Sequence, residues 1–373
     1  MGDVSQLPVI VAAGGFALAF IFGAVANRTN FCTMGAVSDI VNMGHWGRMR
    51  MWLLAIAVAI IGTNILDLTG QIDLSKSFYT RPNVTWLAYI LGGFLFGVGM
   101  TLGSGCGSKT LVRVGGGSLK SLVVFVFLGI AAYMTLKGLF AIWRTRWIDP
   151  VATDLAAFKL SGQDVPTLIS AWTGASANAT QLVVALVVAA ALLAFVLKDR
   201  DFRGSFDHLL GGIVVGLVVV GGWYLTGHVG HAENPATLED TYFGTNSRTI
   251  ESLSFTAPVG YVLELLMLWS DKSLTVTFGI AATVGIIAGS AAYALATKTF
   301  RWEGFANAED TAMHIIGGIL MGFGGVTALG CTIGQGLSGF STLALGSILA
   351  FVAIVAGSAA TMKWQYWRIT REG

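Results

Sequence analysis

Nine apolar stretches follow one another along the chain, each close to the ~20 residues that a helix needs to cross the hydrocarbon core of a bilayer. Shorter polar or glycine-rich connections separate them, so the hydropathy pattern predicts nine transmembrane helices. The predicted spans cover residues 9–26, 51–68, 86–103, 118–140, 181–197, 208–226, 274–296, 312–329 and 341–362.

Four further segments are too short or too polar to face lipid, namely residues 30–43, 107–114, 250–268 and 332–338. Backbone of this kind is tolerated at membrane depth only where it is buried in protein or lines a water-filled cavity. We therefore expect four re-entrant half-helices or loops. The predicted fold class is an all-α integral membrane protein with nine transmembrane helices and four re-entrant elements.

The composition agrees with a membrane protein, because 54% of the residues are hydrophobic and only 11% are charged. Soluble domains carry about 25% charged residues. The formal net charge of +2 gives no basic surface of the kind that binds nucleic acid, so we do not expect a nucleic-acid partner. The expected partners are the lipid bilayer and a small molecule.

Basic residues predict the orientation of the chain in the membrane. Arg48 and Arg50 follow the first re-entrant segment, and further Lys and Arg residues follow spans five, seven and nine. All of these lie on one side if the N-terminus is outside and the C-terminus is cytoplasmic, as the positive-inside rule requires. The opposite side also carries basic residues, but acidic residues accompany them there.

A glycine-rich motif ending in cysteine occurs twice, 225 residues apart. The copies are GGFLFGVGMTLGSGC (92–106) and GGILMGFGGVTALGC (317–331), identical at seven of fifteen positions. On the predicted topology the copies run in opposite directions, which is typical of inverted-repeat transporters with broken helices. We expect one transmembrane domain, 1–373, made of half 1 (about 9–142), a linker span (about 181–197) and half 2 (about 208–362). Residues 143–180 form a predicted external loop.

Broken helices predict an anion site, because a helix N-terminus presents unpaired N–H groups and positive partial charge. Polar and glycine residues surround each predicted break. The candidate pathway residues beside the cysteines are Asn30, Thr33, Gly105, Gly107, Ser108, Lys109, Thr110, Gly330, Thr332 and Gln335. Asp39 and Glu264 lie in predicted re-entrant segments, yet no carboxylate stands out as a cation site. We expect no metal, no cofactor and no catalytic residue.

All three cysteines of the chain, Cys32, Cys106 and Cys331, fall at predicted breaks and none falls within a plain span. A single free cysteine in an apolar protein is commonly a small buried hydrophobe. Because all three cysteines lie at predicted breaks, we favour a role for them in the pathway. There, a cysteine S–H group could donate a weak hydrogen bond to a soft sulfur atom of the substrate. No CxxC or zinc-type spacing is present, so a disulfide framework is not expected.

Three motifs in order carry a resemblance to a known family: NFCTMGA (30–36), GSGC (103–106) and GCTIGQG (330–336). The chain resembles the YeeE/YedE family of bacterial membrane proteins, and within it the thiosulfate transporters. The resemblance implies a multi-pass protein of the bacterial inner membrane that takes up thiosulfate. It also implies that the ion passes the thiols in turn, and that a cytoplasmic TusA-like sulfur carrier is a partner. On the predicted topology, the order from outside is Cys331, Cys106, Cys32.

Three alternatives stay open from the residues. The substrate could be another sulfur or selenium compound handled by the same family. The protein could be a membrane thiol enzyme or sulfurtransferase, although no CxxC or cofactor motif supports this. It could also be a channel, which predicts passive flux with no role for the thiols.

Overall fold

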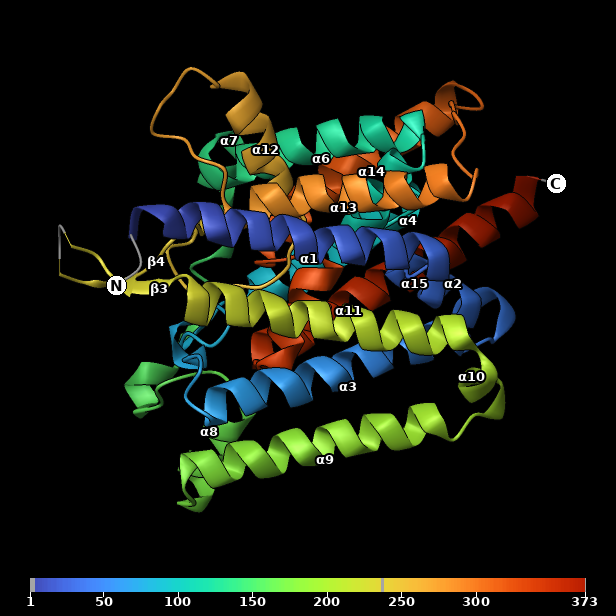
Figure 1. Cartoon of the computed structure of the whole chain (residues 1–373). Helices are drawn as coiled ribbons and strands as arrows, with labels where there is room; N and C mark the ends of the chain where they lie inside the picture. Colours follow the sequence, from blue (N-terminus) through green and yellow to red (C-terminus); the bar gives the residue numbers. More distant parts are fainter. Residues whose placement is uncertain (1–3, 236–237, 373) are drawn as a thin grey trace.

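Long helices make up most of the protein, and several run side by side between two ends of the molecule (Figure 1). The computed structural model describes residues 4–235 and 238–372. The predicted all-α membrane class is confirmed, with two small sheets in addition. The long helices are α1 (Leu7–Thr29), α3 (Gly47–Leu68), α6 (Leu119–Lys137), α9 (Ala177–Leu197), α11 (Phe206–Tyr224), α13 (Phe278–Ala296), α14 (Ala308–Thr327) and α15 (Leu345–Glu372). Helix α4 (Gly93–Leu102) is shorter and directly continues a π-helical turn, η3 (Ala88–Gly92).

Short elements connect the long helices or close their ends. The π-helical turns are η3 (Ala88–Gly92), η4 (Arg144–Ile148), η6 (Leu225–Val229) and η7 (Gly334–Gly339). The 3-10 turns are η1 (Val4–Gln6), η2 (Leu74–Lys76) and η5 (Leu155–Phe158), and the short helices are α2 (Thr33–Met43), α5 (Gly107–Gly115), α7 (Leu139–Trp143), α8 (Val165–Thr173), α10 (Arg200–Gly204) and α12 (Ala257–Met267). Strand β1 (Asn83–Val84) pairs antiparallel with β2 (Thr153–Asp154), and β3 (His231–Glu233) with β4 (Asp240–Tyr242).

The two ends of the helix array define two faces. We call the end with the start of α1, α8 and the β3–β4 hairpin the N-terminal face (Figure 1). The opposite end, with α2, α10 and the end of α15, is the C-terminal face (Figure 1).

Within the described residues, eight helical stretches are long and apolar enough to cross a membrane. Helix α14 was predicted as a further span and is not one of the eight. Its first turn carries Glu309 and Asp310, and it packs against α4 and α6. The structure thus confirms a multi-pass membrane protein, while the count of nine crossings stays a prediction.

Each of the four predicted re-entrant segments contains a short helical element: α2, α5, α12 and the turn η7. In residues 250–268, α12 begins at Ala257, and residues 250–256 before it contain no helix. Pro258 lies in the first turn of α12, where its missing N–H costs no hydrogen bond. The depth of these elements in a membrane stays a prediction.

The glycine motifs allow helices to approach one another closely. A Cβ atom added at Gly99 of α4 would lie 2.7 Å from the carbonyl oxygen of Gly317 in α14, and one added at Gly92 would lie 2.7 Å from that of Gly324. A Cβ at Gly97 would lie 2.1 Å from the carbonyl oxygen of Ile354 in α15. Small residues are the usual means of such contact in membranes, where helices gain no hydrophobic drive from association.

Helices in the first part of the chain pack against helices in the second part, and these contacts come in corresponding pairs. Helix α1 packs on α13 while α11 packs on α3, and α6 packs on α14 while α15 packs on α4. Helices α1 and α11 contact each other, as do α4 and α14, and α9 lies at the edge against α3 (Figure 1). A two-fold relation between the halves would produce this pairing, so it supports the predicted repeat. The opposite orientation of the halves in a membrane stays a prediction.

The predicted 143–180 loop is anchored to the start of α15 by Gln163, which is fully buried. Its Nε2 atom donates to the carbonyl oxygen of Arg81 at 3.0 Å, and its Oε1 atom accepts from the backbone N–H of Gly346 at 3.1 Å. The Leu345 N–H also donates to the Gln163 carbonyl at 3.1 Å. The loop therefore satisfies backbone groups at the N-terminus of α15.

Candidate functional site

Each of the three breaks contains a residue with left-handed backbone two positions before the cysteine. Asn30 has φ 52°, Ser104 has φ 57° and Leu329 has φ 59°. Asn30 also ends α1, because its N–H bonds back to Ala26. A left-handed L-residue costs roughly 1–2 kcal/mol, so the same strained geometry at all three positions marks the breaks as specified features of the fold.

Each cysteine then stands at the start of a short helical element. Cys32 is the N-cap of α2, and its sulfur accepts the Gly35 N–H at 3.3 Å. Cys331 precedes η7, and its sulfur accepts the Gly334 N–H at 3.4 Å. Cys106 is the N-cap of α5. All three cysteines therefore lie at the end of a helical element where unpaired N–H groups and positive partial charge gather, and the sulfurs of Cys32 and Cys331 accept one of these N–H groups.

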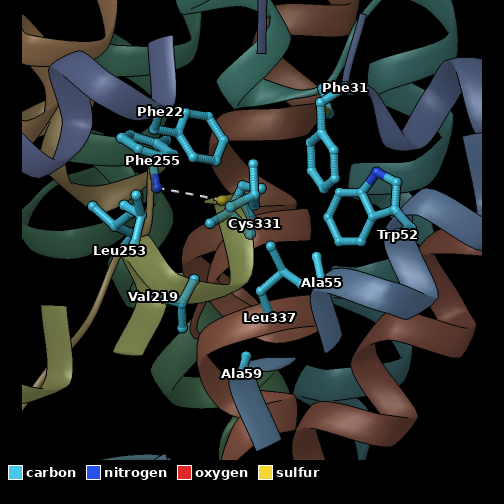
Figure 2. Close-up of a cluster of buried hydrophobic side chains, with 14 of the residues drawn as sticks. Phe22, Phe31, Trp52, Ala55, Ala59, Val219, Leu253, Phe255, Cys331 and Leu337 are labelled. Atoms are coloured by element: carbon cyan, nitrogen blue, oxygen red, sulfur yellow. Dashed lines mark hydrogen bonds between the residues drawn. The ribbon is translucent and has the colours of Figure 1, made fainter. Parts of the chain in front are cut away.

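Cys331 lies at the centre of a buried apolar cluster, as Figure 2 shows. Its sulfur accepts a second hydrogen bond, from the Phe255 N–H at 3.3 Å (Figure 2). Leu253 and Phe255 lie on one side of it and Leu337 on another (Figure 2). The extended segment 250–256 thus brings a backbone donor to the thiol from a distant part of the chain.

Cys106 connects the other two cysteines. Its thiol lies near the Cys32 thiol and near Thr332, and its Sγ lies 3.4 Å from the Ser108 Oγ. Thr332 directly follows Cys331 in the chain, so Cys106 lies between the other two sites. The three cysteines are free and buried in this structure.

A cavity opens on either side of this thiol series. The C-terminal-face cavity ends at Cys32 and is lined by Asn30, Arg48, Lys109, Arg113 and Arg301, with Glu303 at its edge. Positively charged side chains dominate its charged lining, so it favours an anion.

The N-terminal-face cavity ends at Gly330, the residue before Cys331. Arg144 and Glu251 are the two charged residues in its lining, beside Ser254 and Tyr261. Most of the remaining lining is apolar and includes Phe78, Pro258 and Phe278.

The two cavities do not meet in this structure. Cys106 and Cys331 have no exposed surface, and Cys32 is 4% exposed. Phe31 stacks on Trp52 with ring centroids 4.7 Å apart, and Phe22 contacts both Phe31 and Phe255. The arrangement is a closed barrier that contains two thiols, with a third thiol at the edge of one cavity.

Comparison with known proteins gives this geometry a family. Residues 28–360 match the family described as Sulphur transport. The chain belongs to this family. The thiosulfate transporter TsuA of Spirochaeta thermophila is 28% identical over 360 residues, covering 95% of this chain and 98% of that protein. The thiosulfate transporter TsuA of Escherichia coli is 26% identical over 332 residues, covering 85% of this chain and 84% of that protein.

Membership in the family confirms the resemblance found from the three cysteine motifs. The family consists of transport proteins. Membership therefore supports, at the level of the family, a transporter and not an enzyme. The eight apolar helical stretches agree with a protein that crosses the membrane several times.

The structure brings together most of the residues that the sequence singled out. Asn30, Cys32 and Lys109 line the C-terminal-face cavity, where the Lys109 Nζ donates to the Asn30 Oδ1 at 3.3 Å. Gly330 lines the opposite cavity. The others are buried and line neither cavity: Thr33, Gly105, Cys106, Gly107, Ser108, Thr110, Cys331, Thr332 and Gln335.

Three of these buried residues have polar atoms without a hydrogen-bond partner among the described residues. They are the Thr33 Oγ1, the Thr332 Oγ1 and the Gln335 Oε1. The Gln335 amide nitrogen, in contrast, donates to the Ala328 carbonyl. Buried polar atoms are nearly always paired, so these three oxygens mark positions where a ligand, water or a moved side chain could bind.

Several residues of the site were missed by sequence reasoning. Arg144, Glu251 and Arg301 line cavities although none lies beside a cysteine in the chain. Phe255 contributes only its backbone N–H, which no side-chain pattern reveals. Its position in a predicted re-entrant segment was the one available signal.

Other residues have structural roles. Arg28 pairs with Asp207 at 3.0 Å on the surface. The two carboxylates in the predicted re-entrant segments are also paired: Asp39 with Arg48 at 2.5 Å, and Glu264 with Lys137 at 3.0 Å. In the described part of the chain, no three His, Cys, Asp or Glu residues are placed to hold a metal ion.

Proposed function

We propose that this protein carries thiosulfate across the bacterial inner membrane, along the series Cys331, Cys106, Cys32. The observation that carries the proposal is the row of three free thiols at helix N-termini between two cavities. The two relatives named thiosulfate transporters support this choice of substrate.

Thiosulfate has two chemically different ends, and the site offers a match for each. The anionic sulfonate oxygens can accept hydrogen bonds from backbone N–H groups at the starts of the short helices. The terminal sulfur is soft and polarisable, and a cysteine S–H can donate a weak hydrogen bond to it. Successive thiols would hand the ion on without a permanent covalent bond.

The closed barrier must open for the ion to pass, since Cys106 and Cys331 have no exposed surface. Only local movement is needed, because Cys106 already interacts with both Cys32 and Thr332. The aromatic side chains of Phe22, Phe31 and Phe255 lie around the thiols and would have to shift.

Charge supports an orientation with the N-terminal face outside and the C-terminal face in the cytoplasm. Arg48, Arg50, Arg200 and Arg203 belong to elements near the C-terminal face, in agreement with the positive-inside rule. In this orientation the halves would form an inverted repeat, and a cytoplasmic TusA-like carrier would receive sulfur at the C-terminal face.

The test is uptake of labelled thiosulfate by cells that lack other sulfur importers. We expect uptake by the wild type and at least a hundredfold loss in Cys106→Ala, with smaller or equal losses in Cys32→Ala and Cys331→Ala. Thr135→Ala is a matched control, because Thr135 is fully buried in α6 and bonds only within its own helix, to Ala131.

Each outcome bears on a different part of the proposal. Full uptake by folded Cys106→Ala protein would refute the thiol series while keeping the substrate. Absence of uptake by the wild type, with uptake of another sulfur or selenium anion, would refute thiosulfate as the substrate.

A further inference from the structure

Glu251 is a carboxylate in an unusual place for an anion transporter. It lines the N-terminal-face cavity, whose inner end is Gly330 beside Cys331. An anion that enters by this cavity would share a largely apolar space with a second negative charge whenever Glu251 is ionised. Like charges in such a space repel strongly, because little water is present to screen them.

The backbone holds Glu251 in position relative to the thiols. The Thr226 Oγ1 donates to the Glu251 carbonyl at 2.5 Å, and the Glu251 N–H donates to the same Thr226 oxygen at 3.2 Å. Four residues further along the same extended segment, the Phe255 N–H binds the Cys331 sulfur. The carboxylate and the first thiol of the series are therefore connected by one short, fixed stretch of chain.

No cation neutralises this carboxylate: none of the ion pairs found among the described residues includes Glu251. Its side-chain partner is Ser247, whose Oγ donates to the Oε2 at 2.5 Å. Burial raises the pKa of Glu251 to about 7, while the hydrogen bonds from Ser247 and Asn246 lower it. The group thus changes its charge within the physiological range.

The surrounding elements contribute few charges. The turn η4 contributes Arg144, which is held by Asp149 at 3.6 Å, and α12 contributes Tyr261. Tyr79 also interacts with Glu251 electrostatically. Helices α13 and α14 contribute only apolar residues and glycine to the cavity, such as Phe278 and Val326. Glu251 is therefore the one group of this lining with a pKa near neutrality.

We propose that Glu251 is a proton-binding site coupled to transport: it is protonated when the anion occupies the N-terminal-face cavity. Binding of the proton and binding of the anion then favour each other by the same factor, since linkage is reciprocal. No bond to the substrate forms or breaks. The proton comes from the solution at the N-terminal face, and this inference rests on the proposed transport of thiosulfate.

The test is the pH profile of initial thiosulfate uptake between pH 5.5 and 8.5. The protonated fraction of a group with pKa about 7 falls about tenfold between pH 6 and pH 8. We expect wild-type uptake to fall by about that factor and Glu251→Gln uptake to vary less than about twofold. Glu239→Gln is the control, since Glu239 is an exposed carboxylate near the same face and should keep the wild-type profile.

A second variant keeps the test decisive if Glu251→Gln folds poorly. Ser247→Ala retains the carboxylate and removes a hydrogen bond that favours its ionised form, so the midpoint of the profile should move to higher pH. The coupling would be overturned if wild-type uptake did not depend on pH, or if the pH profile of Glu251→Gln had the same slope as that of the wild type. It would also be overturned if the midpoint of the profile did not move in folded Ser247→Ala. Absence of thiosulfate uptake by the wild type at every pH would overturn the proposed function as well.

Discussion

The two cavities of this transport-family protein lie on opposite sides of the same thiols, yet they differ in charge. The C-terminal-face cavity is lined by Arg48, Lys109, Arg113 and Arg301, against the single carboxylate of Glu303. The N-terminal-face cavity has one arginine and one unpaired carboxylate in a mostly apolar lining. An anion would thus meet a weak, pH-sensitive attraction on one side and a strong, permanent one on the other.

This difference decides where an anion is held more strongly. A positive cavity lowers the energy of an anion bound in it, so an anion that has passed the barrier is stabilised in the C-terminal-face cavity. In the proposed orientation, these basic residues would also agree with the positive-inside rule.

The largest effect is expected from breaking the close contact between helices α4 and α15. In Gly97→Ala the new Cβ would lie 2.1 Å from the Ile354 carbonyl oxygen, a clash with backbone that only a helix shift can relieve. We expect a destabilisation of about 3 kcal/mol or more, measured as loss of the monodisperse peak and a lower Tm in detergent. Gly204→Ala is the control, because nothing lies within 4 Å of a Cβ there. An unchanged Tm for Gly97→Ala would contradict the described α4–α15 contact.

Thiol labelling tests the difference between the two cavities, because it shows which cysteine a reagent can modify from each cavity. In single-cysteine variants, a small charged thiol reagent should modify Cys32 from the C-terminal face, because Cys32 lines that cavity. Cys106 and Cys331 should react about a hundredfold more slowly from either face, since they have no exposed surface. The rate of labelling of each cysteine is measured by mass spectrometry on membrane vesicles of both orientations. Rapid labelling of Cys331 from the C-terminal face would show that the barrier lies elsewhere.

Removing the arginine of the N-terminal-face cavity should weaken capture of the anion. The Arg144 Nε is buried without a hydrogen-bond partner among the described residues, so it is available to a ligand. We expect Arg144→Met to raise the KM for uptake about tenfold, the equivalent of ~1.4 kcal/mol for one charge-assisted hydrogen bond. Arg146→Met is the matched control, because Arg146 lies over the Trp147 ring and does not line the cavity. Equal effects of the two variants would remove Arg144 from the site.

A smaller effect is expected on the opposite side. In Lys109→Met, the C-terminal-face cavity retains three arginines, so uptake should fall only about threefold. The loss should shrink as salt concentration rises, because screening weakens the field of the cavity. Uptake measured at two ionic strengths tests this. A loss as large as that of Cys106→Ala would mean that Lys109 contacts the ion during the passage itself.

The smallest effect concerns a residue near the C-terminal face that lines neither cavity. Arg28 pairs with Asp207, and the two side chains are 44% and 51% exposed. Exposed ion pairs contribute about 0–1 kcal/mol, so Arg28→Gln should leave both Tm and uptake nearly unchanged. A fall in uptake of more than twofold would place Arg28 in the pathway after all.

The sequence by itself determined the class of the protein and the positions of its breaks. Apolar stretches of about 20 residues have few alternatives to a membrane helix, because backbone polar groups must be satisfied within the segment. The motifs ending at Cys106 and Cys331 identified the breaks, since glycine and polar residues interrupt an otherwise apolar helix. These are local properties, and the start of α12 at Ala257 shows their limit.

Tertiary structure alone decided which residues meet. Arg144 and Glu251 share a cavity although more than 100 residues separate them in the chain. The Phe255 N–H binds the Cys331 sulfur across 76 residues, and Thr332 lies near Cys106 although the two belong to different parts of the chain. Such contacts depend on how helices cross, and the crossings depend on distances of a few ångströms between glycines such as Gly99 and Gly317. Local hydropathy carries no information about those distances, because packing between helices is a property of pairs of segments and not of either segment alone.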